Sequence, residues 1–79
     1  MKIQRTITYY EKIGEEFLGE QIIEANIDTL KKIIIPYEND PEVYMVYPLT
    51  FEHKKIVKQI FGIELDIENY DYFLECSQA

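Results

Sequence analysis

Both ends of the chain alternate polar and apolar side chains, and this pattern constrains the fold more than any other feature. In the segment from Lys2 to Glu11, Ile3, Ile7 and Tyr9 fall on one face and polar residues fall on the other. A period of two with many β-branched residues is typical of a strand with one solvated face. Residues 70–76 alternate in the same way. The sequence therefore predicts a first and a last strand.

A second strand follows the first closely. The alternation breaks around Gly14, a residue that adopts turn conformations closed to other residues. Residues 17–25 then read as a strand, which predicts an N-terminal hairpin. Ile22 and Ile23 are adjacent, and only one of them can point into the core, so the register of this strand stays open.

Two helices are expected between the hairpin and the last strand. Asn26 is a predicted N-cap, and the apolar stripe of the first helix consists of Ile27, Leu30 and Ile34. Residues 33–35 also fit a strand, and Pro36 ends the element in either case. Thr50 is expected to cap a second helix with an apolar stripe of Ile56, Val57, Ile60 and Phe61, and Gly62 is its expected C-terminal stop.

The segment between the helices contains a loop at residues 36–42 and a short apolar run at residues 43–47. We expect this run to be an extended piece or an edge strand that Pro48 stops. The predicted order is strand, strand, helix, short strand, helix, strand. This order favours an α+β fold, with a small antiparallel sheet and both helices packed on one of its faces.

At 79 residues, the chain has room for one hydrophobic core, so we expect residues 1–79 to form a single domain. Its 47% of hydrophobic residues indicates a packed globule. The single cysteine, Cys76, excludes an internal disulfide. No stretch resembles a signal peptide or approaches the ~20 apolar residues of a membrane span, so we expect a cytoplasmic location.

The net charge of −7 is concentrated in the second half of the chain. Residues 1–37 carry five basic and six acidic side chains, whereas residues 38–79 carry three and nine. Such a surface repels phosphate backbones and anionic lipids, which disfavours direct binding to nucleic acid or membranes. It favours a basic protein partner. The alternative is acidity that serves only solubility.

The residue inventory argues against catalysis. His53 is the only histidine, and its place in the first turn of a helix favours a polar surface role over that of a general base. Cys76 continues the apolar face of the last strand, which favours packing over a nucleophilic role. One His and one Cys cannot form a zinc site, and the acidic loop lacks the spacing of a calcium loop. We expect no enzyme activity, no metal and no cofactor.

What remains is an acidic surface interleaved with tyrosines. Tyrosine gives a large contact area at low entropy cost, and carboxylates attract and pair with lysine and arginine. The predicted partner-binding residues are Glu38, Asp40, Glu42, Tyr44, Tyr47, Glu64, Asp66, Glu68, Tyr70 and Asp71. The alternative is that the tyrosines pack the sheet and the acids are ordinary solvated side chains.

Several segments of the second half carry a resemblance to known proteins. These segments are Asp40 to Thr50 (DPEVYMVYPLT), Gly62, Leu65–Asp66 and Tyr70 to Glu75 (YDYFLE). They resemble a group of small bacterial proteins whose genes often accompany polymorphic toxins, some of which are similar to immunity proteins of contact-dependent growth inhibition systems. The first half matches this group only in having a strand hairpin that leads to a short helix.

The resemblance implies that the protein neutralises a toxin domain, commonly a nuclease, by binding over or near its active site. A nuclease presents a basic cleft to nucleic acid, and an acidic inhibitor would be steered to that cleft. Three alternatives stay open. They are a homo-oligomeric or scaffold module that pairs sheet edges, an acidic nucleic-acid mimic that blocks a DNA-binding protein, and a small enzyme that depends on His53.

Overall fold

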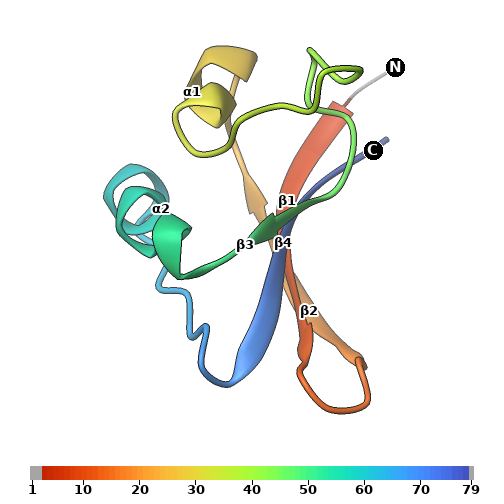
Figure 1. Cartoon of the computed structure of the whole chain (residues 1–79), viewed down its shortest axis with the longest axis vertical. Helices are drawn as coiled ribbons and strands as arrows, with labels where there is room; N and C mark the ends of the chain where they lie inside the picture. Colours follow the sequence, from red (N-terminus) through yellow and green to blue (C-terminus); the bar gives the residue numbers. More distant parts are fainter. Residues whose placement is uncertain (1–2, 79) are drawn as a thin grey trace.

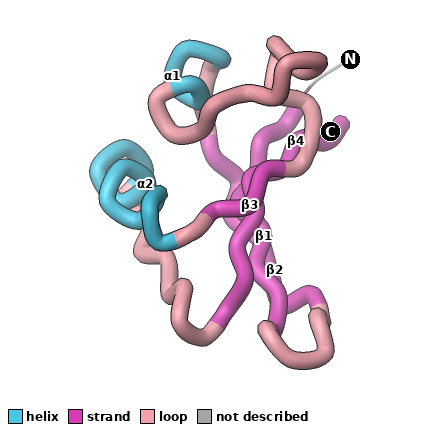
Figure 2. The backbone as a smooth tube through the Cα atoms, viewed as in Figure 1, coloured by secondary structure: helices cyan, strands magenta, loops and turns pink. Residues whose placement is uncertain are grey.

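The computed structural model describes residues 3–78, which form a small α+β fold (Figures 1 and 2). Its elements, in chain order, are β1 (Ile3–Glu11), β2 (Phe17–Ile23), α1 (Ile27–Lys31), β3 (Tyr47–Leu49), the 3₁₀ turn η1 (Phe51–His53), α2 (Lys54–Phe61) and β4 (Tyr70–Gln78). The four strands make one antiparallel sheet in the order β2-β1-β4-β3. The first and last strands of the chain are therefore its two central strands. Lys2, which the sequence places in the first strand, lies outside the described residues.

Both helices lie on the same side of the sheet, as the sequence predicts (Figure 1). Residues that pair directly across antiparallel strands share a face. Ile7 pairs with Leu74 and Tyr9 pairs with Tyr72, so these four side chains point toward the helices. We call this side of the sheet the inner face and the opposite side the open face. The buried core consists of Ile7, Ile23, Leu30, Ile33, Ile34, Val43, Tyr47, Leu49, Val57, Leu65, Tyr72 and Leu74.

The structure fixes the register that the sequence leaves open in β2. Ile23 is 7% exposed and packs in the core, whereas Ile22 is 66% exposed and lies on the open face. Tyr9 pairs with Gly19 and Tyr10 pairs with Phe17, so a bulge interrupts the ladder. The preceding turn contains Gly14 with φ 92°, in agreement with the prediction.

Helix α1 is capped as predicted but is shorter than its apolar stripe suggests. The Asn26 side chain accepts a hydrogen bond from the Thr29 amide at 2.8 Å. The helix ends at Lys31, and the isoleucines that follow lie in turn and irregular backbone, so the strand alternative for residues 33–35 is wrong. Ile33 and Ile34 are nevertheless buried, so this hydrophobic run packs in the core without regular secondary structure.

The strand expected at residues 43–47 is also wrong in its bounds. The extended segment is β3, which begins at Tyr47 and contains Pro48. Proline is tolerated there because β3 is an edge strand, where one side of the backbone needs no ladder partner. Val43 is buried with a left-handed φ of 58°, whereas Tyr44, Met45 and Val46 are exposed, so only the first residue of this apolar run packs in the core.

The second helix agrees with the sequence more closely. It begins as the 3₁₀ turn η1, where His53 Nδ1 accepts a hydrogen bond from the Thr50 amide at 2.8 Å. It ends at Gly62, whose φ of 71° is left-handed, as expected of a C-terminal stop. Val57 is fully buried on its apolar stripe. None of the helices within residues 3–78 is long and apolar enough to span a membrane.

Candidate protein-binding surface

Aromatic side chains lie on the open face toward the end of the sheet where β1 turns into β2. Tyr10 of β1 contacts Phe17 of β2 and Phe73 of β4 edge to face, with ring centroids 5.6 and 5.5 Å apart. The three rings therefore form a strip across three adjacent strands. Within residues 3–78 both helices lie on the other side of the sheet, so this strip is only partly covered (Figure 1). We call Tyr10, Phe17 and Phe73 the aromatic strip.

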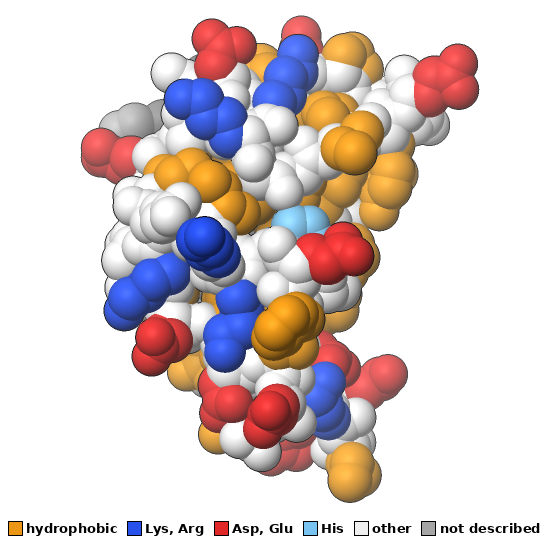
Figure 3. Space-filling view, turned by 60° about the vertical axis from the view of Figure 1, so that its left-hand side comes forward, with side chains coloured by type: hydrophobic (Ala, Val, Ile, Leu, Met, Phe, Trp, Pro, Cys, Tyr) orange, Lys and Arg blue, Asp and Glu red, His pale blue; other side chains and the backbone are white. Residues whose placement is uncertain are grey.

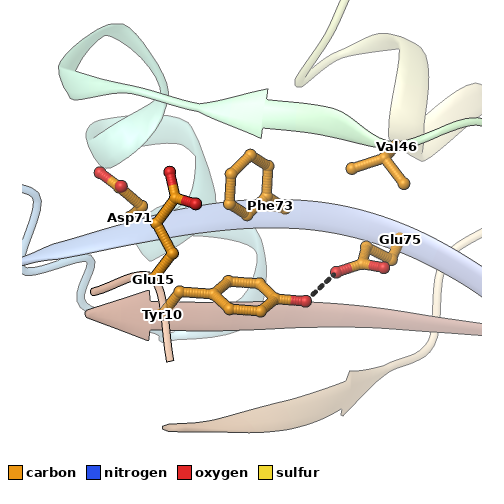
Figure 4. A pocket seen from close by; sticks show the side chains of 6 residues that line it. All are labelled: Tyr10, Glu15, Val46, Asp71, Phe73 and Glu75. Atoms are coloured by element: carbon orange, nitrogen blue, oxygen red, sulfur yellow. Dashed lines mark hydrogen bonds between the residues drawn. The ribbon is translucent and has the colours of Figure 1, made fainter. Parts of the chain in front are cut away.

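One carboxylate beside the strip is held in place by its neighbours. Tyr10 Oη donates a hydrogen bond to Glu75 Oε2 at 3.3 Å (Figure 4). Thr8 Oγ1 donates to the same oxygen. Both donors come from β1, the strand that pairs with β4. A carboxylate fixed by two hydroxyl donors keeps lone pairs free for a lysine or arginine of a partner.

Two rings of the strip, those of Tyr10 and Phe73, line an open hollow of about 350 Å³ (Figure 4). Its lining residues are Tyr10, Glu15, Val46, Asp71, Phe73 and Glu75. Glu15 and Asp71 lie at one end of the hollow and Glu75 at the other, with the rings of Tyr10 and Phe73 between them. An apolar floor between carboxylates suits a lysine or arginine, whose stem packs on rings while its charged end pairs with an acid.

Charge is distributed unequally between the two sides of the molecule. Five lysines lie in the two helices or directly after α1: Lys31, Lys32, Lys54, Lys55 and Lys58. Figure 3, which brings the helix side forward, shows basic side chains on this surface. Near the open face, Lys12 pairs with Asp71 at 2.9 Å. Glu15, Glu20 and Glu75 add further carboxylates on the open side. The open face therefore combines its aromatic strip with carboxylates, whereas five of the six lysines of residues 3–78 belong to the helix layer.

Two of the predicted partner-binding residues are buried. Asp40 is 5% exposed and Tyr47 is 3% exposed. One carboxylate oxygen of Asp40 accepts the amide of Tyr44 at 2.8 Å. The other accepts the amide of Met45 at 2.9 Å and the hydroxyl of Tyr47 at 2.6 Å. These groups are used inside the loop, so we assign both residues to its structure.

Electrostatics supports this structural role. Burial alone would raise the pKa of Asp40, but the hydrogen bonds from Tyr47, Met45 and Tyr44, together with the charge of Arg5, hold that pKa below its ordinary value. Burial and the hydrogen bond to Asp40 raise the pKa of the Tyr47 hydroxyl. The loop therefore contains an ionised carboxylate beside a neutral phenol at neutral pH.

Arg5 fastens the same loop to the sheet. Its guanidinium donates to the carbonyl of Glu42 at 3.0 Å and to the carbonyl of Val43. It also lies over the ring of Tyr44, 5.5 Å from the centroid. Arg5 is itself buried on the inner face, so the charge that closes the loop is unavailable to a partner.

The remaining predicted residues do not form one patch. Glu38, Glu42 and Tyr44 are exposed on the loop beside the start of β1, whereas Glu64, Asp66 and Glu68 are exposed on the connection that leads into β4. Figure 1 shows these two connections at opposite ends of the sheet. Tyr70 packs edge to face on Tyr9, with ring centroids 5.7 Å apart. Of the ten predicted residues, Asp71 alone lines the hollow.

Sequence reasoning missed most of the hollow. Tyr10, Glu15, Phe73 and Glu75 were not among the predicted contacts. A signal was present, because Phe73 falls between Asp71 and Glu75 on the polar face of a period-two segment. An aromatic residue on the solvated face of a strand is a better guide to a binding surface than a tyrosine on its apolar face.

The two residues considered for catalysis, His53 and Cys76, both lie within elements of the fold. His53 caps a helix through its ring nitrogen, and Cys76 is a half-buried free thiol on β4. Within residues 3–78, no group of three or more His, Cys, Asp or Glu side chains is arranged to hold a metal ion.

Comparison with known proteins gives a family but no function. No curated protein matches the chain. One family model matches residues 4–75, a span that includes all of the hairpin except Ile3, both helices and most of β4. The family is described as a domain of unknown function. Because the match covers nearly the entire chain, the protein belongs to the DUF7683 family.

Proposed function

We propose that the protein is a non-enzymatic inhibitor of the immunity type, which binds a basic toxin in the cytoplasm through the open face of its sheet. The observation that carries this proposal is the combination of the aromatic strip with carboxylates on one face, while the lysines of the helix layer lie on the other side. A nuclease fits best as the toxin, because its substrate-binding cleft is basic.

Apolar area and charge contribute differently to such a complex. The strip provides rings that a partner would remove from water, and buried aromatic side chains supply much of the affinity of protein interfaces. The carboxylates of Glu20, Asp71 and Glu75 act at longer range, because they raise the association rate of a positively charged partner. An inhibitor bound through these carboxylates would compete with nucleic acid for the same cleft.

The scaffold also suits tight binding. Tyr10 and Phe73 lie on the two central strands, each of which is paired on both sides. Side chains on such strands are held more rigidly than side chains on loops, so less conformational entropy is lost when a partner binds.

The test is a titration of the protein with the product of its adjacent gene, by calorimetry and stopped flow, at low and high salt. Two matched variants locate the contact surface. Glu15→Lys/Glu20→Lys reverses two charges near the open face, and Glu64→Lys/Glu68→Lys makes the same change in net charge on the connection before β4.

We expect tight binding whose association rate falls with salt. The open-face variant should weaken binding by about tenfold or more, whereas the control should change it by less than about threefold. Equal losses in both variants would reject the open face as the contact surface. No binding at either salt concentration would reject the immunity function.

A further inference from the structure

Strand β2 is an edge of the sheet, and no other strand among residues 3–78 pairs with its outer side. It pairs with β1 on one side, and its other side is the end of the strand order. Ladder hydrogen bonds of an antiparallel pair use alternate residues, so the remaining residues of Phe17–Ile23 direct both N–H and C=O away from β1. An edge of this kind is a template for one more strand.

The opposite edge shows what protection looks like. Strand β3 has only three residues and contains Pro48 at its centre, and both features discourage another strand from pairing. Strand β2 has seven residues and contains neither proline nor lysine. The same small sheet therefore has one closed edge and one open edge.

Apolar side chains border the open edge. Ile22 and Phe17 are among the exposed large hydrophobic residues, at 66% and 51%, and Leu18 is exposed at the bulge. Phe17 is also the outermost ring of the aromatic strip. A strand added to β2 would cover part of this area and would extend the open face without a break.

The acidic residues in and around β2 indicate which kind of strand could pair with this edge. From Ile13 to Leu30 the chain has five acidic side chains and no lysine, arginine or histidine. Glu20 lies in the middle of β2, with Glu16 and Glu24 just beyond its ends. A second copy of the strand would bring like charges together, which is destabilising across paired strands. A basic strand would instead bring lysine or arginine side chains next to Glu16, Glu20 and Glu24.

We propose that the β2 edge binds an extended segment of a basic protein as a fifth, antiparallel strand. The segment presents lysine or arginine opposite Glu20 and an apolar residue opposite Ile22, and main-chain hydrogen bonds hold it in register. This inference rests on the proposed function, since it assumes a basic protein partner, and it adds the mode by which that partner is held.

The probe is a synthetic peptide built to this pattern, acetyl-Lys-Thr-Val-Thr-Lys-Thr-Val-Lys-amide. Run antiparallel to β2, with Leu18 left unpaired at the bulge as it is opposite β1, it places lysines opposite Glu24, Glu20 and Glu16 and valines opposite Ile22 and Phe17. We expect saturable binding below about 1 mM at low salt. Alternate amides of β2 should become protected from hydrogen exchange, because they acquire partners in the added strand.

Two N-methylated forms of the peptide provide the decisive control, one methylated on both valine amides and the other on two threonine amides. In an added strand only one alternate set of amides faces β2. One form should lose about tenfold or more in affinity, and the other should stay within about threefold. Equal affinities of the two forms, or no saturable binding of the parent peptide, would overturn the proposal.

Variants of the chain supply a second control. Glu20→Lys should weaken peptide binding by about fivefold or more, whereas Glu68→Lys, with the same change in net charge, should leave it within about twofold. A concentration-dependent dimer whose β2 amides are protected without peptide would also overturn the proposal, in favour of self-pairing. If the peptide binds and the product of the adjacent gene does not, strand addition stands and the immunity function fails.

Discussion

The two faces of the sheet use neighbouring residues for different purposes. Leu74 and Phe73 are consecutive on β4, yet Leu74 is 2% exposed in the core, whereas Phe73 lines the hollow on the open face. Successive side chains of a strand point to opposite faces, so these two neighbours lie on opposite sides of the sheet. One short strand therefore supplies stability on one side and a recognition surface on the other.

Tyrosine shows the same division. On the inner face, Tyr9 stacks on Tyr72 with ring centroids 5.6 Å apart, and the Tyr72 hydroxyl accepts the amide of Asp66 at 3.2 Å. On the open face, the hydroxyl of Tyr10 donates to Glu75 beside a hollow. The environment of the hydroxyl, rather than the residue type, distinguishes a packing tyrosine from one that is available to a partner.

The largest expected effect comes from Leu74→Ala. It removes a buried side chain from the centre of the inner face, and such truncations cost about 2 to 5 kcal/mol of unfolding free energy. Phe73→Ala is the matched change on the open face, where loss of the contact with Tyr10 should cost about 1 kcal/mol. Urea denaturation of both variants measures the difference, and equal costs would contradict the division between the faces.

Strand β4 shows how much of the difference between the two faces can be predicted from the sequence. Alternation in residues 70–76 correctly separates Tyr72 and Leu74 from Phe73. It does not show which neighbours each face receives, because strand order depends on contacts between distant parts of the chain. The pairing of β1 with β4, which brings Tyr10 beside Phe73 on the open face, joins residues 59 to 75 positions apart.

The burial of Asp40 in the loop before β3 was not predicted, again because it depends on contacts that the sequence pattern does not show. Residues 38–42 look like a solvated acidic loop, yet Asp40 is buried, because backbone amides and the Tyr47 hydroxyl replace the water that its carboxylate gives up. Hydrogen bonds of this kind depend on backbone geometry that composition does not specify. Acidic residues therefore predicted a surface where the chain builds a structural anchor.

That anchor gives the next prediction, Asp40→Asn. The pKa of Asp40 is lowered in the folded protein, so its contribution to stability is present above the unfolded pKa of about 4 and is lost as the pH falls through the folded pKa. The variant should be less stable than the native protein at pH 7, and the difference between them should shrink below about pH 4. Unfolding curves from pH 7 to pH 2 measure this difference. A gap that stays constant with pH would show that Asp40 acts only through its shape.

A smaller effect is expected where β2 passes under the inner-face tyrosines. A Cβ added at Gly19 would lie 3.0 Å from the hydroxyl of Tyr9, whose ring is held by Tyr70 and Tyr72. Gly19→Ala should cost about 1 kcal/mol, because this crowding outweighs the entropy gained by replacing glycine. Thermal unfolding and near-UV circular dichroism check it. A stabilised variant would show that the tyrosines yield, and that the inner face is less tightly packed than its ring contacts suggest.

The smallest effect should come from Lys12→Gln, which breaks the ion pair with Asp71 at the rim of the open face. Both side chains are about two-fifths exposed, and pairs of this kind contribute about 0.5 kcal/mol or less. Unfolding at low and high salt should therefore differ little between the variant and the native protein. A loss above about 1 kcal/mol would mean that open-face charges stabilise the fold. If the loss is small, Asp71 is free to exchange Lys12 for a cation of the partner, and removing Lys12 should then raise the association rate of the basic protein.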